Sequence, residues 1–263
     1  MRRIAIALTA TGLVFAQTSA PSHSLKFEVA TLKPNTTGDN RGIIKPAQGG
    51  QRYEATNLAA RFYIMTAYRL KGEQIVGGPA WIDSDRFDMQ GKAEKPSTND
   101  ELHEMLKSLL EERFQLKFHW DNKEMPIYAL TVDKGGPKIE QHQATNAGDP
   151  WIDQSIDGAI HVKMTGTFAP MDYFVWRLGQ LMDRPVVDMT KLKGGYDFTL
   201  TYTRELPPGI QEGASFNGQP IDTSGPSIFQ AVQKQMGLKL EAQKGMAPVM
   251  VIDRMEKPTA TDN

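Results

Sequence analysis

The sequence predicts an α+β fold made of two related halves, each with helices packed on mixed or antiparallel sheets. Its 263 residues are 40% apolar and 23% charged, a balance typical of folded globular domains. A chain of this length corresponds to one large or two small domains. An internal repeat and the alternation of short β-type segments with amphipathic ones indicate the two halves.

The chain matches itself when it is shifted along its own sequence. Three pairs of segments keep their apolar character, the first two at a shift of 122 positions and the third at 109: 114–118 with 236–240, 125–130 with 247–252, and 86–89 with 195–198. We therefore expect a duplicated unit, with a longer connection in the second copy. The predicted parts are a first repeat at 26–134, a polar linker loop at 135–158, a second repeat at 159–256 and a frayed tail at 257–263.

The N-terminal segment 1–16 has the features of a secretory signal peptide. Arg2 and Arg3 precede an apolar stretch at 4–15, and cleavage is expected after Ala16, with Ala20 as the second choice. An apolar stretch of about 12 residues is too short to span a membrane, which takes about 20. We expect an exported protein, periplasmic or extracellular, that does not span the membrane after cleavage.

Each half is predicted to run strand-helix-strand-strand-helix-strand-strand. In the first half a strand at 51–55 leads to a helix capped by Asn57, with Leu58, Phe62 and Met65 on one face. The second half begins with a strand at 159–165, and Pro170 opens a helix whose inward stripe is Met171, Phe174, Val175, Leu178, Leu181 and Met182. The next strands are expected at 74–76 and around 86–89 in the first half, and at 185–187 and around 195–198 in the second.

The second helix of each half has clear capping signals. Capping side chains and early negative charge at 97–101 precede a buried face of Leu102, Met105, Leu106, Leu109 and Leu110. The counterpart opens at 224–227, has Gly237 as a left-handed C-cap, and turns inward Ile228, Phe229, Val232 and Met236. Each helix is followed by two strands, at 115–120 and 127–133, and at 238–243 and 249–256. A strand at 27–32 precedes the first half, and loops are expected at 33–50, 135–158 and 203–225.

No motif in the sequence identifies a reaction. There is no cysteine, no Gly-x-Ser-x-Gly turn, no phosphate-binding loop and no pair of histidines at helical metal-ligand spacing. We therefore expect no catalytic residue, no metal site and no cofactor. The net charge of −1 lacks the basic character of a nucleic-acid-binding protein.

Asp88 has a counterpart at Asp197 under the shift of 109 positions. A residue repeated within one chain is typical of a fold role, such as hydrogen bonding to a neighbouring turn. If the protein uses dispersed acid–base groups, the weak candidates are Asp88, Asp197 and His119.

Three tryptophans are candidates for ligand contact, because an indole can stack on a sugar ring or anchor a peptide. They are Trp81, Trp120 and Trp151. Trp151 lies in a polar loop, where its exposure would call for a partner. Trp81 precedes a turn, and its alternative role is to pack locally and hold that turn in place.

Four segments, 27–35, 77–88, 109–118 and 195–200, resemble a large exported bacterial family of unknown function that is abundant in soil bacteria. The resemblance covers residues 27 to about 258. In that family the same domain is also fused to membrane metallopeptidase sensors of the antibiotic-resistance-regulator type. The zinc motif of those peptidases is not found in this sequence, so the resemblance implies no protease activity, and no catalytic residue can be carried over.

These observations favour a non-catalytic exported binding module, whose ligand is an envelope peptide, protein or cell-wall fragment (glycan). Pairing of a ligand with a sheet edge would leave no side-chain motif in the sequence. The alternative is a hydrolase-like envelope enzyme that uses dispersed Asp and His residues. No nucleic-acid partner is expected.

Overall fold

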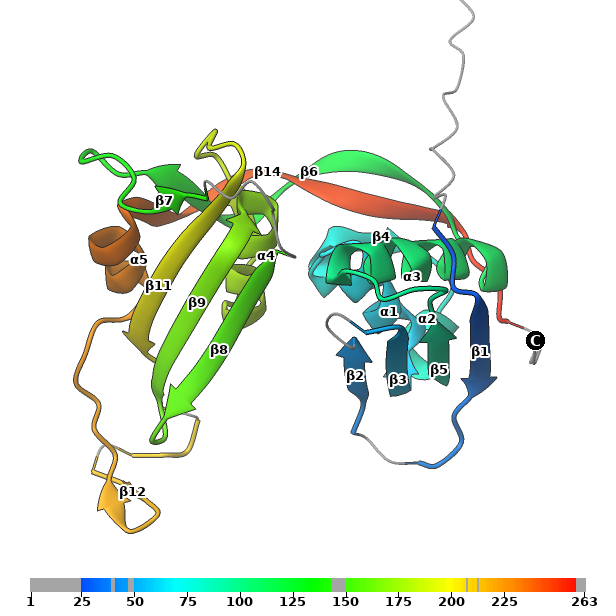
Figure 1. Ribbon diagram of the computed structural model, residues 1–263, viewed down its shortest axis with the longest axis horizontal. Coiled ribbons are helices and arrows are strands. Elements are labelled where there is room, and N and C mark those ends of the chain that lie inside the picture. Colours follow the sequence, from blue (N-terminus) through cyan, green and yellow to red (C-terminus); the bar gives the residue numbers. More distant parts are fainter. Residues whose placement is uncertain are drawn as a thin grey trace, which may run out of the picture.

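The computed structural model describes residues 25–38, 41–46, 50–142, 150–206, 208–211 and 213–258. The predicted signal peptide at 1–16 and the end of the predicted tail at 259–263 lie outside these residues. The described chain has the predicted α+β class, with two lobes joined by a long two-stranded ribbon (Figure 1). No helix of this described part is long and apolar enough to cross a membrane.

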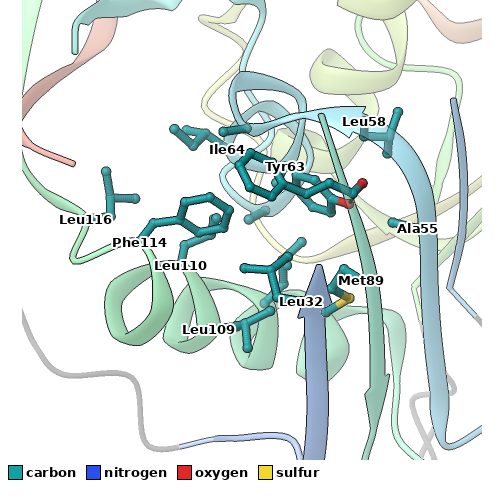
Figure 2. Close-up of a cluster of buried hydrophobic side chains, with 14 of the residues drawn as sticks. Leu32, Ala55, Leu58, Tyr63, Ile64, Met89, Leu109, Leu110, Phe114 and Leu116 are labelled. Carbon is teal, nitrogen blue, oxygen red and sulfur yellow. Dashed lines mark hydrogen bonds between the residues drawn. The ribbon is translucent and has the colours of Figure 1, made fainter. Parts of the chain in front are cut away.

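The first lobe holds a four-stranded antiparallel sheet in the order β1(Val29–Pro34), β5(Arg86–Lys92), β3(Arg52–Ala59) and β2(Ile43–Pro46). Its helical elements are α1(Ala60–Ala67), η1(Gly72–Gln74), α2(Trp81–Ser84) and α3(Asn99–Arg113). Leu32 and Met89 of the sheet meet Leu109 and Leu110 of α3 in one buried cluster (Figure 2). Alternate strand residues and one helix stripe thus form the first core.

The second lobe repeats this arrangement with other residues. Its antiparallel sheet has the order β7(Glu140–Gln141), β11(Gly195–Thr203), β9(His161–Pro170) and β8(Trp151–Asp157). The helices are α4(Met171–Leu181) and α5(Ile228–Met236), and a small hairpin is formed by β12(Ser215–Phe216) and β13(Gln219–Pro220). In each of the two sheets, the second strand in chain order lies at one edge and the third lies next to it.

The ribbon consists of β6(Lys117–Val132) and β14(Leu238–Arg254), paired antiparallel along nearly their whole length. Figure 1 shows it arching from one lobe to the other. β4(Ile75–Gly77) pairs parallel with the end of β14, and β10(Val186–Asp188) pairs parallel with the end of β6. Each long strand therefore starts at one lobe and ends at the other lobe, where it pairs with a short parallel strand.

The lobes exchange strands through this ribbon. Met250 and Ile252 of β14 belong to the first core, whereas Leu130 of β6 belongs to the second. The register keeps the shift of 122 positions, because the pair Tyr128↔Ala242 becomes the pair Met250↔Trp120 when the shift is applied in both directions. The register of the ribbon is therefore symmetric under this shift.

The expectation of two strands after each second helix is wrong, because β6 and β14 are each continuous. Residues 121–124 are polar and exposed, and they lie in the part of β6 that crosses between the lobes. Pro126 and Pro248 lie inside these continuous strands. Their register places their nitrogens away from the partner long strand, so no ladder hydrogen bond is lost.

The predicted start of the first helix is also wrong. Asn57 is not its N-cap: this residue has φ of +57° and lies at a bulge between β3 and β5, and the N-cap is Ala59. The later start turns another face inward, so that Tyr63 and Ile64 are buried while Phe62 is 43% exposed. Leu181 and Phe229, expected inside, are also exposed.

The capping predictions for the second helix of each half, α3 and α5, are confirmed. Thr98 and Glu101 form a reciprocal capping box at α3, and Ser227 and Gln230 form one at α5. Gly237 ends α5 with φ of +65°. The three predicted loops, in contrast, contain short strands, namely β2, β7, β8, β12 and β13.

Candidate functional site

Asp88 and Asp197 hold equivalent bulges in the two lobes. Asp88 accepts hydrogen bonds from the Asn57 amide and the Asn35 side chain, both at 2.8 Å. Asp197 accepts one from the Phe168 amide at 2.8 Å and contacts His142 Nδ1 at 2.6 Å. Asn57 and Phe168 both have positive φ, so each carboxylate satisfies an amide at a left-handed residue just before α1 or α4.

The hydrogen bonds of Asp197 also affect its ionisation. Burial raises the pKa of this carboxyl group, but the Phe168 amide and His142 lower it by more, so the pKa lies below its usual value. A carboxylate held in the charged form by a backbone amide is suited to a structural task.

The three acid–base candidates are distributed over different parts of the molecule. Asp88 lies in the sheet of the first lobe and Asp197 in the sheet of the second. His119 lies on the ribbon, where its exposed ring contacts Asp253 at 2.8 Å. The structure does not bring Asp88 and Asp197 into one site.

The three tryptophan candidates have different surroundings. Trp81 stacks on Phe114 with ring centroids 6.1 Å apart and packs against the first core. Trp151 begins β8 opposite Thr167. Trp120 lies on the ribbon, is 51% exposed, and meets Tyr68 and Phe118 edge-on. Trp120 is the member of this set that lines a groove.

This groove, here called the interlobe groove, has a volume of about 660 Å³. It is lined by the end of α1 with the following turn, by one face of α3, by α4 and β10 of the second lobe, and by the ribbon. Its lining includes Tyr68, Arg69, Lys71, Asp100, His103, Glu104, Lys107, Trp120, Asp172, Trp176, Val186 and Asp188. A concave surface of this size, lined by aromatic, aliphatic and charged side chains, can hold a ligand.

Two basic side chains of the first lobe, Arg69 and Lys71, contact α4 across the groove. Arg69 follows α1 in the left-handed conformation, forms ion pairs with Asp100 and Asp172, and lies 4.5 Å from the centre of the Tyr173 ring. Lys71 Nζ donates to the Gly179 carbonyl at 2.9 Å and to the Met182 carbonyl at 2.5 Å. These carbonyls end α4, where a positive charge is favoured.

An aromatic cluster forms the rim under the ribbon. Tyr68, Phe118 and Trp120 contact one another edge to face, with ring centroids 5.1 to 6.4 Å apart. Lys107 lies 5.3 Å from the centre of the Tyr68 ring and pairs with Glu104 at 2.5 Å. Burial, together with Glu111 and Glu104, raises the pKa of Tyr68, so its hydroxyl stays neutral.

His103 of α3 is the buried titratable group of the groove, with 9% of its surface exposed. Burial, together with the neighbouring Arg69 and Lys107, lowers its pKa to about 4, although Glu104 opposes this shift. The ring is therefore neutral at pH 7. Its Nδ1 has no hydrogen-bond partner within the described residues.

The charges that face solvent in the groove are negative. The side chains of Arg69, Lys71 and Lys107 are 17 to 19% exposed, whereas that of Asp172 is 72% exposed. Asp188, at the end of β10, is exposed as well. In the part of the chain that the structure describes, no three His, Cys, Asp or Glu side chains are arranged to hold a metal ion.

Sequence reasoning identified Trp120 but not the groove. Arg69, Lys71 and α4 meet across more than a hundred residues of sequence, and none of them belongs to a motif. The local signal for the groove was a basic residue, Arg69, soon after a short helix. This pattern is common in proteins and does not identify a site.

Comparison with known proteins gives one result. Searches of curated proteins and of solved structures found no match. A family profile described as "Protein of unknown function (DUF3738)" matches residues 61–255, which include nearly all of α1, the interlobe groove and the whole ribbon. Because this match covers most of the chain, the protein belongs to the DUF3738 family.

Proposed function

We propose that this protein is a non-catalytic binding module of the cell envelope and that the interlobe groove holds its ligand. The N-terminal segment with the features of a signal peptide supports the location. The groove, with a half-exposed indole on its rim, supports the activity. An exposed aromatic side chain next to a concave surface gains the most when a ligand covers it.

The geometry supports binding better than hydrolysis. General acid–base catalysis needs titratable groups within reach of one substrate. Asp88 and Asp197 instead satisfy backbone amides in separate sheets, and His119 lies on the ribbon beside Asp253. The ion pairs of Arg69 and Lys107 give the groove a rigid, charged wall rather than a reactive group.

Affinity capture from an envelope extract with the protein lacking residues 1–16 tests this proposal. We expect the native sequence to retain a reproducible ligand and Trp120→Ala to lose most of it. Phe216→Ala is the matched control, because Phe216 is 48% exposed on the β12–β13 hairpin and does not line the groove. Equal retention by all three proteins, or none by the native one, would contradict the proposal.

A further inference from the structure

We infer that the ligand of the interlobe groove is an extended peptide that carries lysine-like or arginine-like side chains. This inference rests on the proposed function and adds the chemical class of the ligand. It follows from three features of the groove, which are its solvent-facing charge, its exposed indole and the position of β10 at the edge of its sheet.

The first feature is the separation of charge by depth. Arg69 and Lys107 are largely buried and paired with carboxylates, and Lys71 is bound to the carbonyls at the end of α4. Asp172 is 72% exposed although it pairs with Arg69 at 3.4 Å, and Asp188 is exposed although its Oδ1 accepts two hydrogen bonds from Thr190. Since neighbouring His103 is neutral at pH 7, a ligand approaching from solvent meets mainly negative charge, which attracts cations and disfavours anions.

The second feature is the face of Trp120. Two cations of the protein already lie over aromatic rings beside the groove, Lys107 over Tyr68 and Arg69 over Tyr173. Within the described residues no cation lies over Trp120, although its side chain is 51% exposed. Indole is the best aromatic partner for an ammonium or guanidinium group, so a cationic side chain of the ligand fits this position.

The third feature is the main chain of β10. The amide of Tyr128 bonds to the Pro185 carbonyl and the amide of Met189 to the Leu130 carbonyl, so Val187 faces β6 in this parallel pair. The N–H and C=O groups of Val186 and Asp188 therefore point to the outer edge of the sheet. Both residues line the groove. Because α4 packs on β10 and a Cβ added to Gly179 would lie 3.7 Å from Val186 N, an extended peptide would pair with this edge at Asp188.

The size of the groove agrees with a short peptide. A volume of about 660 Å³ lies in the range of pockets that bury a ligand of several residues' size. A bound peptide would place one cationic side chain on Trp120 and another near Asp172 while its backbone follows β10.

Titration with three capped hexapeptides tests the inference: alternating Lys and Ala, alternating Glu and Ala, and alternating Ser and Ala. Binding is followed by the fluorescence of a dye on each peptide. We expect the lysine peptide to bind most tightly, with an affinity that falls as salt is added. Trp120→Ala and Asp172→Asn should each weaken it about 3- to 10-fold. Asp153→Asn, an exposed carboxylate of β8 outside the groove, should leave it unchanged.

The outcomes separate this inference from the proposed function. If the serine or glutamate peptide, or a cell-wall oligosaccharide, binds as tightly as the lysine peptide and still depends on Trp120, the groove is a binding site but the cationic class is wrong. If Trp120→Ala changes no binding of any probe or extract component, both are wrong. Circular dichroism of each variant verifies that it is folded.

Discussion

At the scale of single residues, the carboxylates of Asp88 and Asp197 each accept a hydrogen bond from a backbone amide that would otherwise lack a partner in the sheet. Each accepts the amide of a residue with positive φ at a bulge, and each bulge directs the chain from a strand into a helix. The carboxylate satisfies an amide that the bulge takes out of the strand ladder. This is the fold role that the repeated position predicts.

Replacement of either carboxylate should therefore reduce stability. We expect Asp88→Ala and Asp197→Ala each to lower the free energy of unfolding by about 1–3 kcal/mol, because a bulge amide loses its acceptor. Urea denaturation measures this change, and Asp153→Ala, in which an exposed carboxylate is removed, is the control. An unchanged midpoint for both variants would exclude the structural role.

His103 predicts a dependence of stability on pH. Burial lowers its pKa from 6.5 to about 4 in the folded protein, and Arg69 and Lys107 act in the same direction while Glu104 opposes them. Between these two pH values the unfolded chain binds more protons, so stability rises with pH across this window and is lost as pH falls.

The expected contribution of His103 is about 3 kcal/mol between pH 7 and pH 4. Denaturation curves measured across this window give the slope, and His103→Gln removes the titrating ring. Other groups, including Asp197, keep their own contribution in that variant. If both proteins lose stability equally between pH 6.5 and pH 4, His103 is not the cause.

At the scale of elements, capping residues and backbone constraints were more informative than hydrophobic spacing. The boxes at α3 and α5 and the glycine after α5 are local signals, and they are confirmed. The start of α1 was misplaced because Asn57 is a common capping residue that here forms a bulge instead. β8 was missed because its edge position lets Asp153, Ser155 and Asp157 face solvent.

Gly237 ends α5, and a substitution at this position should lower the stability of the fold. An added Cβ would lie 2.2 Å from the Gly136 carbonyl oxygen, and the φ of +65° is costly for other residues. We expect Gly237→Ala to lower the free energy of unfolding by more than about 1 kcal/mol. Gly209→Ala, at φ of +89° with no atom near its Cβ position, separates the contact from the backbone effect. Equal losses would show that the contact with Gly136 is unimportant.

At the scale of the whole molecule, neither lobe is completed by its own part of the sequence. The first core takes Met250 and Ile252 from β14, and the second takes Leu130 from β6. Arg69 and Lys71 add polar contacts between the first lobe and α4. The predicted class could be read from local periodicity, but these contacts join distant residues that carry no shared pattern, and so the groove could not be predicted.

A fragment that contains only the predicted first repeat, residues 26–134, should not fold alone. It lacks the β14 segment that pairs with β4 and fills the first core. We expect weak far-ultraviolet circular dichroism and no cooperative thermal transition, and recovery of both when a fragment with residues 150–258 is added. A cooperative transition of residues 26–134 alone would show that the exchanged strand is dispensable.

The position of β14 after all the other strands of both lobes also determines the order of events during synthesis. Because residues 238–254 complete both cores, neither core reaches its final packing until β14 has been made. If the protein is exported, this delay keeps the chain incompletely folded while it passes through a translocation channel. Folding is then completed on the far side of the membrane.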